Sequence, residues 1–280
     1  MTDDMIGASG IRSMIELENG VRMPVLGLGL WRAPTGKAKE AVLHALSAGY
    51  RLIDTAMIYG NETDVGQALR ESGLAREDVF ITTKLWRAHH GKAKATRAFE
   101  RSLKNLGMDY VDLYLVHWPG DGDRLGSWRA MEELYEQGRC RAIGVSNYTI
   151  DHLEELLAVC RHPPAVNQVE FHPFLYQKGL LEYCQERRIQ VEAYSPLTHA
   201  HKLKDPRLSS IASKYDRTPA QILIRWGLQH GLVEIPKSVH RERILENARV
   251  FDFSIGEEDM AFLDSMDEGL RFSWDPTQVP

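Results

Sequence analysis

The sequence has few cysteines and no long apolar run. Its three cysteines, Cys140, Cys160 and Cys184, form no CxxC pair and have no histidine at the spacing of metal ligands. This pattern argues against a structural zinc site or a disulfide framework and is typical of core cysteines in a reducing compartment. No stretch approaches the roughly 18 apolar residues that a membrane-spanning helix needs. We therefore expect a cytoplasmic protein without a metal site.

Basic residues are not in excess either. Lysine and arginine number 34 against 39 aspartate and glutamate residues, which gives a formal net charge of -5. This balance offers no electrostatic reason to bind nucleic acid or an anionic membrane, so we expect a small molecule as the partner. The first residues, "MTDDMIGASGIRS", lack the basic start and apolar run of a signal peptide. We interpret residues 1–13 as a disordered leader.

Short apolar runs alternate with longer segments of helical period from residue 26 onward. The predicted strands are residues 26–30, 51–55, 79–84, 111–117, 141–146, 165–170, 189–195 and 232–236. The predicted helices are residues 37–48, 62–72, 92–106, 127–137, 150–159, 178–187, 206–215, 218–230 and 241–248. No linker interrupts the series, so it predicts a single α/β domain over residues 1–280, a (β/α)8 TIM barrel with two extra helices. An open doubly wound sheet is the alternative.

A β-hairpin is predicted to open the fold. The segment "MIELENGVRMP" (14–24) alternates apolar and polar residues on both sides of Asn19-Gly20. This pair suits the two positive φ angles of a type I′ turn.

Functional side chains stand at the C-terminal ends of most predicted strands. These ends converge on one mouth of a barrel, where the active sites of this fold lie. The residues there are Asp54, Lys84, His117, Ser146, Asn147, Gln168, Tyr194, Ser195, Lys237 and Ser238. Each alone can be a helix cap, a solvated strand end or a buried histidine. An acid, a base and a histidine on three successive strands favour a catalytic site.

Tyr59 follows Asp54 by five residues and gives this combination a chemical purpose. A phenol with an ordinary pKa of about 10 exchanges protons poorly near neutrality, and an adjacent ammonium lowers that pKa. We expect Lys84 to lower the pKa of Tyr59 and Asp54 to hold the lysine in place. His117 can orient a carbonyl or assist proton transfer.

Trp31, Trp86 and Trp118 also follow predicted strand ends. A single tryptophan in a loop often covers the core, whereas three at one mouth predict an aromatic, largely apolar pocket.

No side chain in this set can donate a hydride, so a carbonyl reduction would need a cofactor. The segment "GLGLWR" (27–32) is not a dinucleotide-binding GxGxxG motif, because Arg32 stands where the last glycine is needed. In "IPKSVHRERILEN" (235–247), Lys237, Ser238 and Arg243 surround a helix start, which suits a phosphate. A solvated basic helix start is the alternative interpretation.

The chain resembles the aldo-keto reductases from about residue 15 to about residue 267. The matching motifs are "DTAMIYGNE" (54–62), "TTKLW" (82–86), "DLYLVHWP" (112–119), "IGVSNY" (143–148), "PAVNQVEFHP" (164–173), "YSPL" (194–197) and "IPKSVHRERILEN". The short loops are most similar to bacterial members that reduce diketogulonate, methylglyoxal and other small carbonyls. The resemblance implies a monomeric, NADPH-dependent reductase of aldehydes and ketones, with a catalytic tetrad of Asp54, Tyr59, Lys84 and His117. Tyr59 is the implied proton donor.

The resemblance also implies which residues contact NADPH and substrate. Tyr194 would stack on the nicotinamide, and Ser146, Asn147 and Gln168 would hold its carboxamide. The remaining cofactor residues implied are Ser195, Pro196 and Leu197 at the pyrophosphate, Lys237, Ser238, Val239 and Arg243 around the 2′-phosphate, and Glu246 and Asn247 near the adenine. The implied substrate residues are Trp31, Trp86, His117 and Trp118.

Two segments depart from the family pattern. The segment "THAHKLKDP" (198–206) replaces a glycine-rich loop that folds over the pyrophosphate in many relatives, and it brings His199 and His201. The tail, residues 267–280, is short and is expected at the barrel mouth, where Trp274 can reach the pocket rim.

Two alternatives to a reductase remain from the sequence. A regulatory or structural protein could bind the nucleotide with little turnover. A phosphate-handling isomerase or aldolase could instead form a Schiff base on Lys84.

Overall fold

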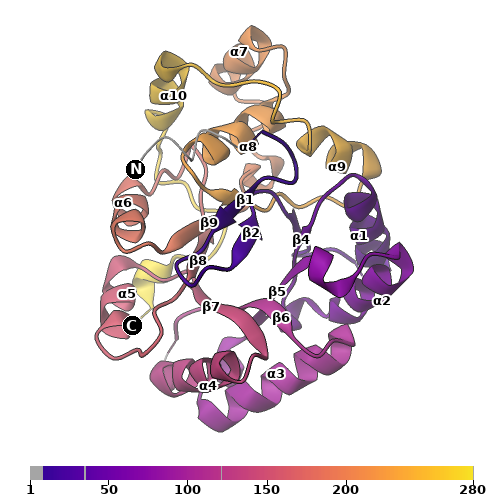
Figure 1. Cartoon of the computed structure of the whole chain (residues 1–280). Coiled ribbons are helices and arrows are strands. Elements are labelled where there is room, and N and C mark those ends of the chain that lie inside the picture. Colours follow the sequence, from indigo (N-terminus) through magenta and orange to yellow (C-terminus); the bar gives the residue numbers. More distant parts are fainter. Residues whose placement is uncertain (1–8, 35, 121, 280) are drawn as a thin grey trace.

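The computed structural model describes residues 9–34, 36–120 and 122–279, so residues 1–8 of the predicted leader lie outside it. Strands β1 (Met14–Glu16) and β2 (Arg22–Pro24) precede an alternating series of strands and helices (Figure 1). The strands of the series are β3 (Leu28–Gly29), β4 (Leu52–Asp54), β5 (Phe80–Leu85), β6 (Val111–Val116), β7 (Cys140–Ser146), β8 (Val166–Glu170), β9 (Gln190–Tyr194) and β10 (Val233–Glu234). Its α-helices are α1 (Lys37–Ser47), α2 (Glu62–Ser72), α3 (Lys92–Leu106), α4 (Arg124–Glu136), α5 (Ile150–Leu157), α6 (Lys178–Glu186), α7 (Pro206–Lys214), α8 (Pro219–Gln229), α9 (Arg241–Asn247) and α10 (Glu257–Asp264). Within these ranges no helix is long and apolar enough to cross a membrane.

Strands β3 to β10 form one parallel sheet in chain order, and the sheet closes on itself. Gly27 N–H donates to the Glu234 carbonyl at 2.8 Å, and Gly29 N–H donates to the Pro236 carbonyl at 3.2 Å. Glycine is needed at this seam, because a Cβ on Gly29 would lie 2.7 Å from the Ile235 carbonyl oxygen. The closed sheet confirms the predicted barrel and excludes the open sheet.

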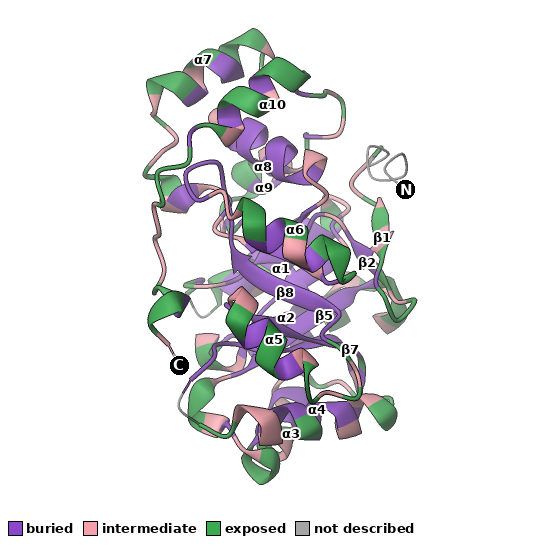
Figure 2. Ribbon diagram, turned by 90° about the vertical axis from the view of Figure 1, so that its left-hand side faces the viewer, coloured by how far each residue is buried: buried purple, intermediate pink, exposed green. Residues whose placement is uncertain are grey.

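The barrel interior is apolar at one end and polar at the mouth. Side chains along a strand alternate between two faces, so one set fills the barrel and the other packs under the helices. The interior set includes Leu52, Phe80, Leu113, Val166 and Val233. The helices bury one face against the sheet and expose the other (Figure 2). Two residues beyond Leu52 and Val166, the same alternation brings Asp54 and Gln168 inward, and both are buried.

The N-terminal hairpin forms, but the prediction of a type I′ turn is wrong. Gly20 has a φ of 80°, whereas the φ of Asn19 is not positive. Gly20 N–H donates to the Leu17 carbonyl at 2.8 Å, which makes a three-residue loop closed by a left-handed glycine. The Asn19 amide instead donates to the Arg141 carbonyl on β7 at 2.9 Å. The turn therefore also fastens the hairpin to the barrel.

The two helices beyond the eight of the barrel are α7 and α10, and they lie side by side (Figures 1 and 2). Helix α7 is predicted from the sequence, whereas α10 is not. Asp259 on α10 joins the two helices by accepting a hydrogen bond from Tyr215 at 2.5 Å and pairing with Lys214 at 2.6 Å.

Glu234 is a buried acid that faces α8 rather than the mouth. A Cβ on Gly227 of α8 would lie 1.6 Å from its Oε1, so the carboxyl group occupies the notch that this glycine leaves. Its Oε2 has no hydrogen-bond partner among the described residues. Burial raises the pKa of Glu234 well above its usual value. Burial therefore favours the protonated, uncharged form of this carboxyl group.

We expect Glu234→Val to stabilise the fold by about 1–3 kcal/mol at pH 8, because it removes a buried acid without a partner. The folded chain keeps this proton at pH values where the unfolded chain has lost it, so stability falls as the pH rises above the ordinary value of 4.5. Urea denaturation should show a larger gain at pH 8 than at pH 5. Glu234→Gln, which cannot titrate, should remove only the pH-dependent part. Equal gains at both pH values would contradict this account.

Candidate active site

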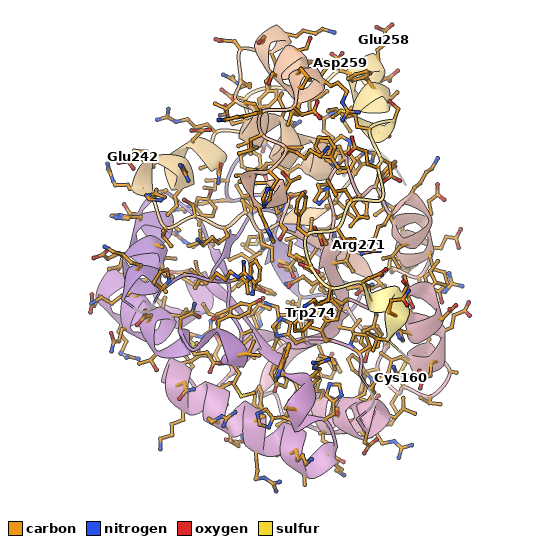
Figure 3. All side chains as sticks on the ribbon, turned by 180° about the vertical axis from the view of Figure 1, so that it is seen from behind. Cys160, Glu242, Glu258, Asp259, Arg271 and Trp274 are labelled. Carbon is orange, nitrogen blue, oxygen red and sulfur yellow. The ribbon has the colours of Figure 1, made fainter. Side chains whose placement is uncertain are left out.

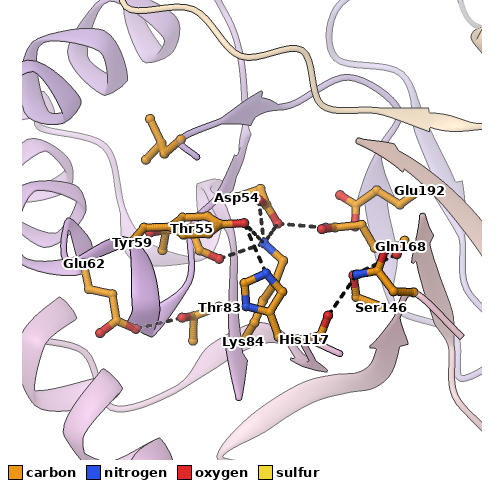
Figure 4. Close-up of polar contacts among 12 residues, drawn as sticks. Asp54, Thr55, Tyr59, Glu62, Thr83, Lys84, His117, Ser146, Gln168 and Glu192 are labelled. Atoms are coloured by element: carbon orange, nitrogen blue, oxygen red, sulfur yellow. Dashed lines mark hydrogen bonds and ion pairs between the residues drawn. The ribbon is translucent and has the colours of Figure 1, made fainter. Parts of the chain in front are cut away.

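Asp54, Tyr59, Lys84 and His117, here called the tetrad, lie together at the barrel mouth (Figure 4). The buried Lys84 ammonium donates to the two Asp54 carboxylate oxygens at 2.7 and 2.6 Å and to the Thr55 carbonyl at 3.0 Å. Its Nζ lies 3.5 Å from the Tyr59 hydroxyl. The same hydroxyl lies 3.4 Å from His117 Nε2. The phenol oxygen therefore stands between an ammonium and an imidazole.

The chain after β4 places Tyr59 through a short, fixed loop. A 3-10 turn over Met57–Tyr59 follows β4 and places the Tyr59 phenol near the end of this strand. Thr55 donates to Asn61 Oδ1 at 2.6 Å, and the Asn61 amide donates to the Leu30 carbonyl at 3.1 Å. These bonds explain why the segment holds an amide and a hydroxyl beside the acid and the phenol.

The prediction that Lys84 lowers the pKa of Tyr59 is wrong. Burial, followed by the charges of Asp54 and Glu192, raises the pKa of Tyr59 well above its usual value. Asp54 contacts the ammonium with both oxygens and so offsets its charge. Burial and then Lys84 lower the pKa of His117 well below its usual value. At neutral pH the tetrad therefore holds a neutral phenol and a neutral imidazole.

The residues predicted to surround the nicotinamide form one hydrogen-bonded row, which consists of Ser146, Asn147, Gln168 and Tyr194. Tyr194 donates to Asn147 Oδ1 at 2.7 Å, and the Asn147 amide donates to the His117 carbonyl at 3.0 Å. The Ser146 hydroxyl donates to the Gln168 carbonyl at 2.8 Å. The Gln168 amide donates to Asp54 Oδ2 at 2.9 Å. The row is thus continuous with the tetrad.

Glu192 also belongs to this site, although it was not predicted from the sequence. It lies on β9 opposite Gln168 in the register, and its Oε2 accepts from Gln168 Nε2 at 2.8 Å. It is completely buried. The signal was available, because Glu192 shares the inward phase of Tyr194 two residues later, and an acid is rare inside an apolar strand.

Two of the three predicted tryptophans line one wall of the mouth. The Trp86 ring packs edge-on against His117 at 5.3 Å between centroids. Trp274 from the tail lies 6.2 Å from Trp86 and 5.6 Å from Trp118. The Trp31 ring lies 5.1 Å from the His199 ring, and the Arg32 guanidinium lies 4.2 Å from the Trp31 ring centroid.

Glu170 at the end of β8 anchors the tail, a role that was not predicted from the sequence. Its two carboxylate oxygens accept from the Phe272 and Ser273 backbone N–H groups at 2.8 and 3.0 Å. His172 Nε2 lies 3.2 Å from the same carboxylate. Figure 3 faces this side of the molecule, with Trp274 labelled on the tail. The anchor fixes where Trp274 meets the other aromatic rings.

The segment after Tyr194 takes a backbone that glycine favours, although it contains no glycine. Thr198, His199 and Ala200 have φ values of 53°, 49° and 69°, and Ser195 has 52°. His199 Nε2 lies 2.9 Å from Ser195 Oγ. The loop thus has the conformation of a glycine-rich turn, held by a side-chain hydrogen bond. The other two predicted pyrophosphate residues, Pro196 and Leu197, are buried and half-buried.

Lys237 pairs with Gly29 at the seam where the barrel closes, and Arg243 lies on α9, near enough for its charge to act on Lys237. Partial burial, followed by the charge of Arg243, lowers the pKa of Lys237. Neither cation forms an ion pair in the part of the chain that the structure describes. Ser238 Oγ accepts from His240 N–H at 3.1 Å. Two neighbouring cations without an acid suit a dianionic phosphate.

The other predicted adenosine residues flank these cations. Val239 is half-buried and Asn247 is buried. Glu246 Oε1 accepts from the Thr218 hydroxyl at 2.7 Å, which links α9 to the start of α8.

Comparison with known proteins shows the family to which the chain is similar. The Aldo/keto reductase family profile matches residues 25–268. The oxidoreductase YtbE of Bacillus subtilis is 49% identical over 95% of this chain and 97% of its own. Glyoxal reductase of the same bacterium is 47% identical over 97% and 99%.

Solved structures give the same result. An aldo-keto reductase from a Medee basin deep-sea metagenome has a TM-score of 0.92 and 46% identity over 96% of this chain and 100% of its own. An aldo-keto reductase complexed with NADPH has a TM-score of 0.88 and 39% identity over 92% and 89%. The chain belongs to the aldo/keto reductase family of oxidoreductases.

Proposed function

We propose that the protein reduces small aldehydes and ketones to alcohols with NADPH, and that Tyr59 is the proton donor. One observation carries the proposal: the Tyr59 hydroxyl lies between Lys84 Nζ at 3.5 Å and His117 Nε2 at 3.4 Å. The name of the glyoxal reductase relative and the NADPH complex of another family member support the substrate class and the cofactor. We also propose that the protein is a monomer in the cytoplasm.

Each side chain at the mouth has a separate role in the proposed carbonyl reduction. A carbonyl oxygen at the mouth would accept from the Tyr59 hydroxyl and from His117, since both groups are neutral and each can donate. As the phenol loses its proton, the phenolate forms beside the Lys84 ammonium, which stabilises it. Asp54 holds that ammonium with two oxygens. Trp86, Trp118 and Trp274 form the apolar wall that would exclude water from the substrate.

The residues fit NADPH, which when bound supplies the hydride. Lys237 and Arg243, which form no ion pair within the described residues, would bind the 2′-phosphate, with Ser238 and Val239 beside them. The remaining residues proposed to hold the nucleotide are Ser146, Asn147, Gln168 and Tyr194 at the nicotinamide, Ser195, Pro196 and Leu197 at the pyrophosphate, and Glu246 and Asn247 at the adenine.

The geometry argues against a Schiff base on Lys84. A Schiff base needs a neutral amine that a carbonyl carbon can reach. Nζ of Lys84 is instead completely buried and donates to two Asp54 oxygens and the Thr55 carbonyl. An isomerase or aldolase of that kind is therefore disfavoured.

The cofactor preference provides a test. We expect Lys237→Met and Arg243→Met each to weaken NADPH binding by about tenfold to a hundredfold, because each removes a charge-assisted hydrogen bond. NADH lacks the 2′-phosphate, so its affinity should change little. Titration by tryptophan fluorescence measures both dissociation constants. Arg241→Met, an exposed neighbour on α9, is the matched control, and an equal loss for NADPH and NADH would refute the assignment.

A further inference from the structure

The Gln168 side chain is held between two carboxyl groups inside the barrel. Its Nε2 donates to Asp54 Oδ2 at 2.9 Å and to Glu192 Oε2 at 2.8 Å. A primary amide has two N–H groups, so both of its donors are used. Only the amide oxygen remains to bind anything else.

Asp54 determines which end of the amide faces the carboxyl groups. Both of its oxygens contact the Lys84 ammonium, so Asp54 is ionised and can only accept. Gln168 must therefore direct Nε2, not its oxygen, toward Asp54. The contacts of the heavy atoms alone therefore fix the orientation of the amide.

Glu192 completes the arrangement from β9. It is 0% exposed, and its Oε1 has no hydrogen-bond partner among the described residues. Burial and then Asp54 raise the pKa of Glu192 to about 8. Neutral pH therefore favours the protonated form of Glu192, and its Oε2 accepts the hydrogen bond from Gln168.

We propose that Glu192 is a positioning residue for the nucleotide: it occupies the second amide hydrogen of Gln168 and leaves Gln168 Oε1 as the sole free group of that amide. A ligand at Gln168 must then present a hydrogen-bond donor, which on nicotinamide is the carboxamide N–H. This inference rests on the proposed function. In this assignment Glu192 acts through its hydrogen bond with Gln168, not on the nucleotide itself.

The residue type at position 192 matters for this role. Leucine would leave the second N–H of Gln168 without a partner in a buried place, and the amide could then turn. Glutamine would still accept through its oxygen, so Gln168 should stay fixed. The two substitutions separate the accepting role of Glu192 from its acidity.

The test compares NADP+ with its 3-acetylpyridine analogue, in which a methyl group replaces the carboxamide NH2. Fluorescence titration gives both dissociation constants without turnover. The wild type should bind NADP+ about threefold to tenfold more tightly, the worth of one neutral hydrogen bond. Glu192→Leu should reduce this preference to about one, whereas Glu192→Gln should retain it.

Glu234→Leu is the matched control, because it removes a buried acid that faces away from the mouth, and it should retain the preference. Glu192→Ala serves if the leucine variant does not fold, with the same expected loss. A wild type that binds neither nucleotide would defeat the proposed function. A wild type that binds NADP+ without preference, or an apolar variant that retains the preference, would overturn only the role of Glu192.

Discussion

Tyr59→Phe should lower kcat for carbonyl reduction by about 10²- to 10⁴-fold, the usual contribution of a general acid. Phenylalanine keeps the ring and removes only the hydroxyl that lies between Lys84 and His117. The hydroxyl forms no hydrogen bond that holds the fold elsewhere among the described residues, so folding should be preserved. NADPH binding should change by less than about threefold, because the proton donor acts on the substrate.

Single-turnover and steady-state rates with a small aldehyde would measure this loss. Tyr183→Phe on α6, where the phenol ring packs against the Arg187 guanidinium, is the matched control and should keep wild-type turnover. Turnover of Tyr59→Phe at the wild-type rate would show that another group donates the proton.

Lys84→Met has the second large expected effect. It leaves the Asp54 carboxylate buried without its cation, which typically costs about 3–5 kcal/mol of folding stability. Lys84→Met combined with Asp54→Asn should recover most of that loss, because the buried charge is gone and Gln168 still has an acceptor. Neither variant should reduce carbonyls, since the ammonium beside Tyr59 is absent in both.

Urea denaturation and turnover measured on the same samples separate the two losses. Lys92→Met is the control, because its ion pair with Glu133 is exposed and worth at most about 1 kcal/mol. If Lys84→Met were no less stable than Lys92→Met, the buried pair would not have the strength assigned to it.

The sequence predicted the barrel well because its signals are local. Strands buried on both faces read as apolar runs, and the polar residue that ends such a run stands out. Asp54, Lys84 and His117 could therefore be placed at one mouth before any contact was known. Helix α10 escaped detection because "EEDMAFLD" buries only Asp259 and Leu263, too few positions to make a clear helical pattern.

The pKa shift of Tyr59 and the roles of Glu192 and Glu170 were not predicted, because each depends on residues that are distant in the sequence and close in space. The direction of the Tyr59 pKa shift required knowledge of burial and of the two oxygens that Asp54 places on Lys84. The inward position of Glu192 could be inferred from the sequence, but its role could not, because its partner, Gln168, is 24 residues away in the chain. The role of Glu170 likewise depends on the tail, which folds back onto it and donates two backbone hydrogen bonds.

The most direct measurement is a titration of the protein with NADPH and NADH, followed by the absorbance of the reduced nicotinamide after addition of glyoxal or another small aldehyde. We predict tighter binding of NADPH than of NADH, and oxidation of NADPH that depends on the aldehyde. Tight NADPH binding with no oxidation across a panel of carbonyls would indicate a regulatory nucleotide-binding protein. Failure to bind either nucleotide would contradict the proposed function altogether.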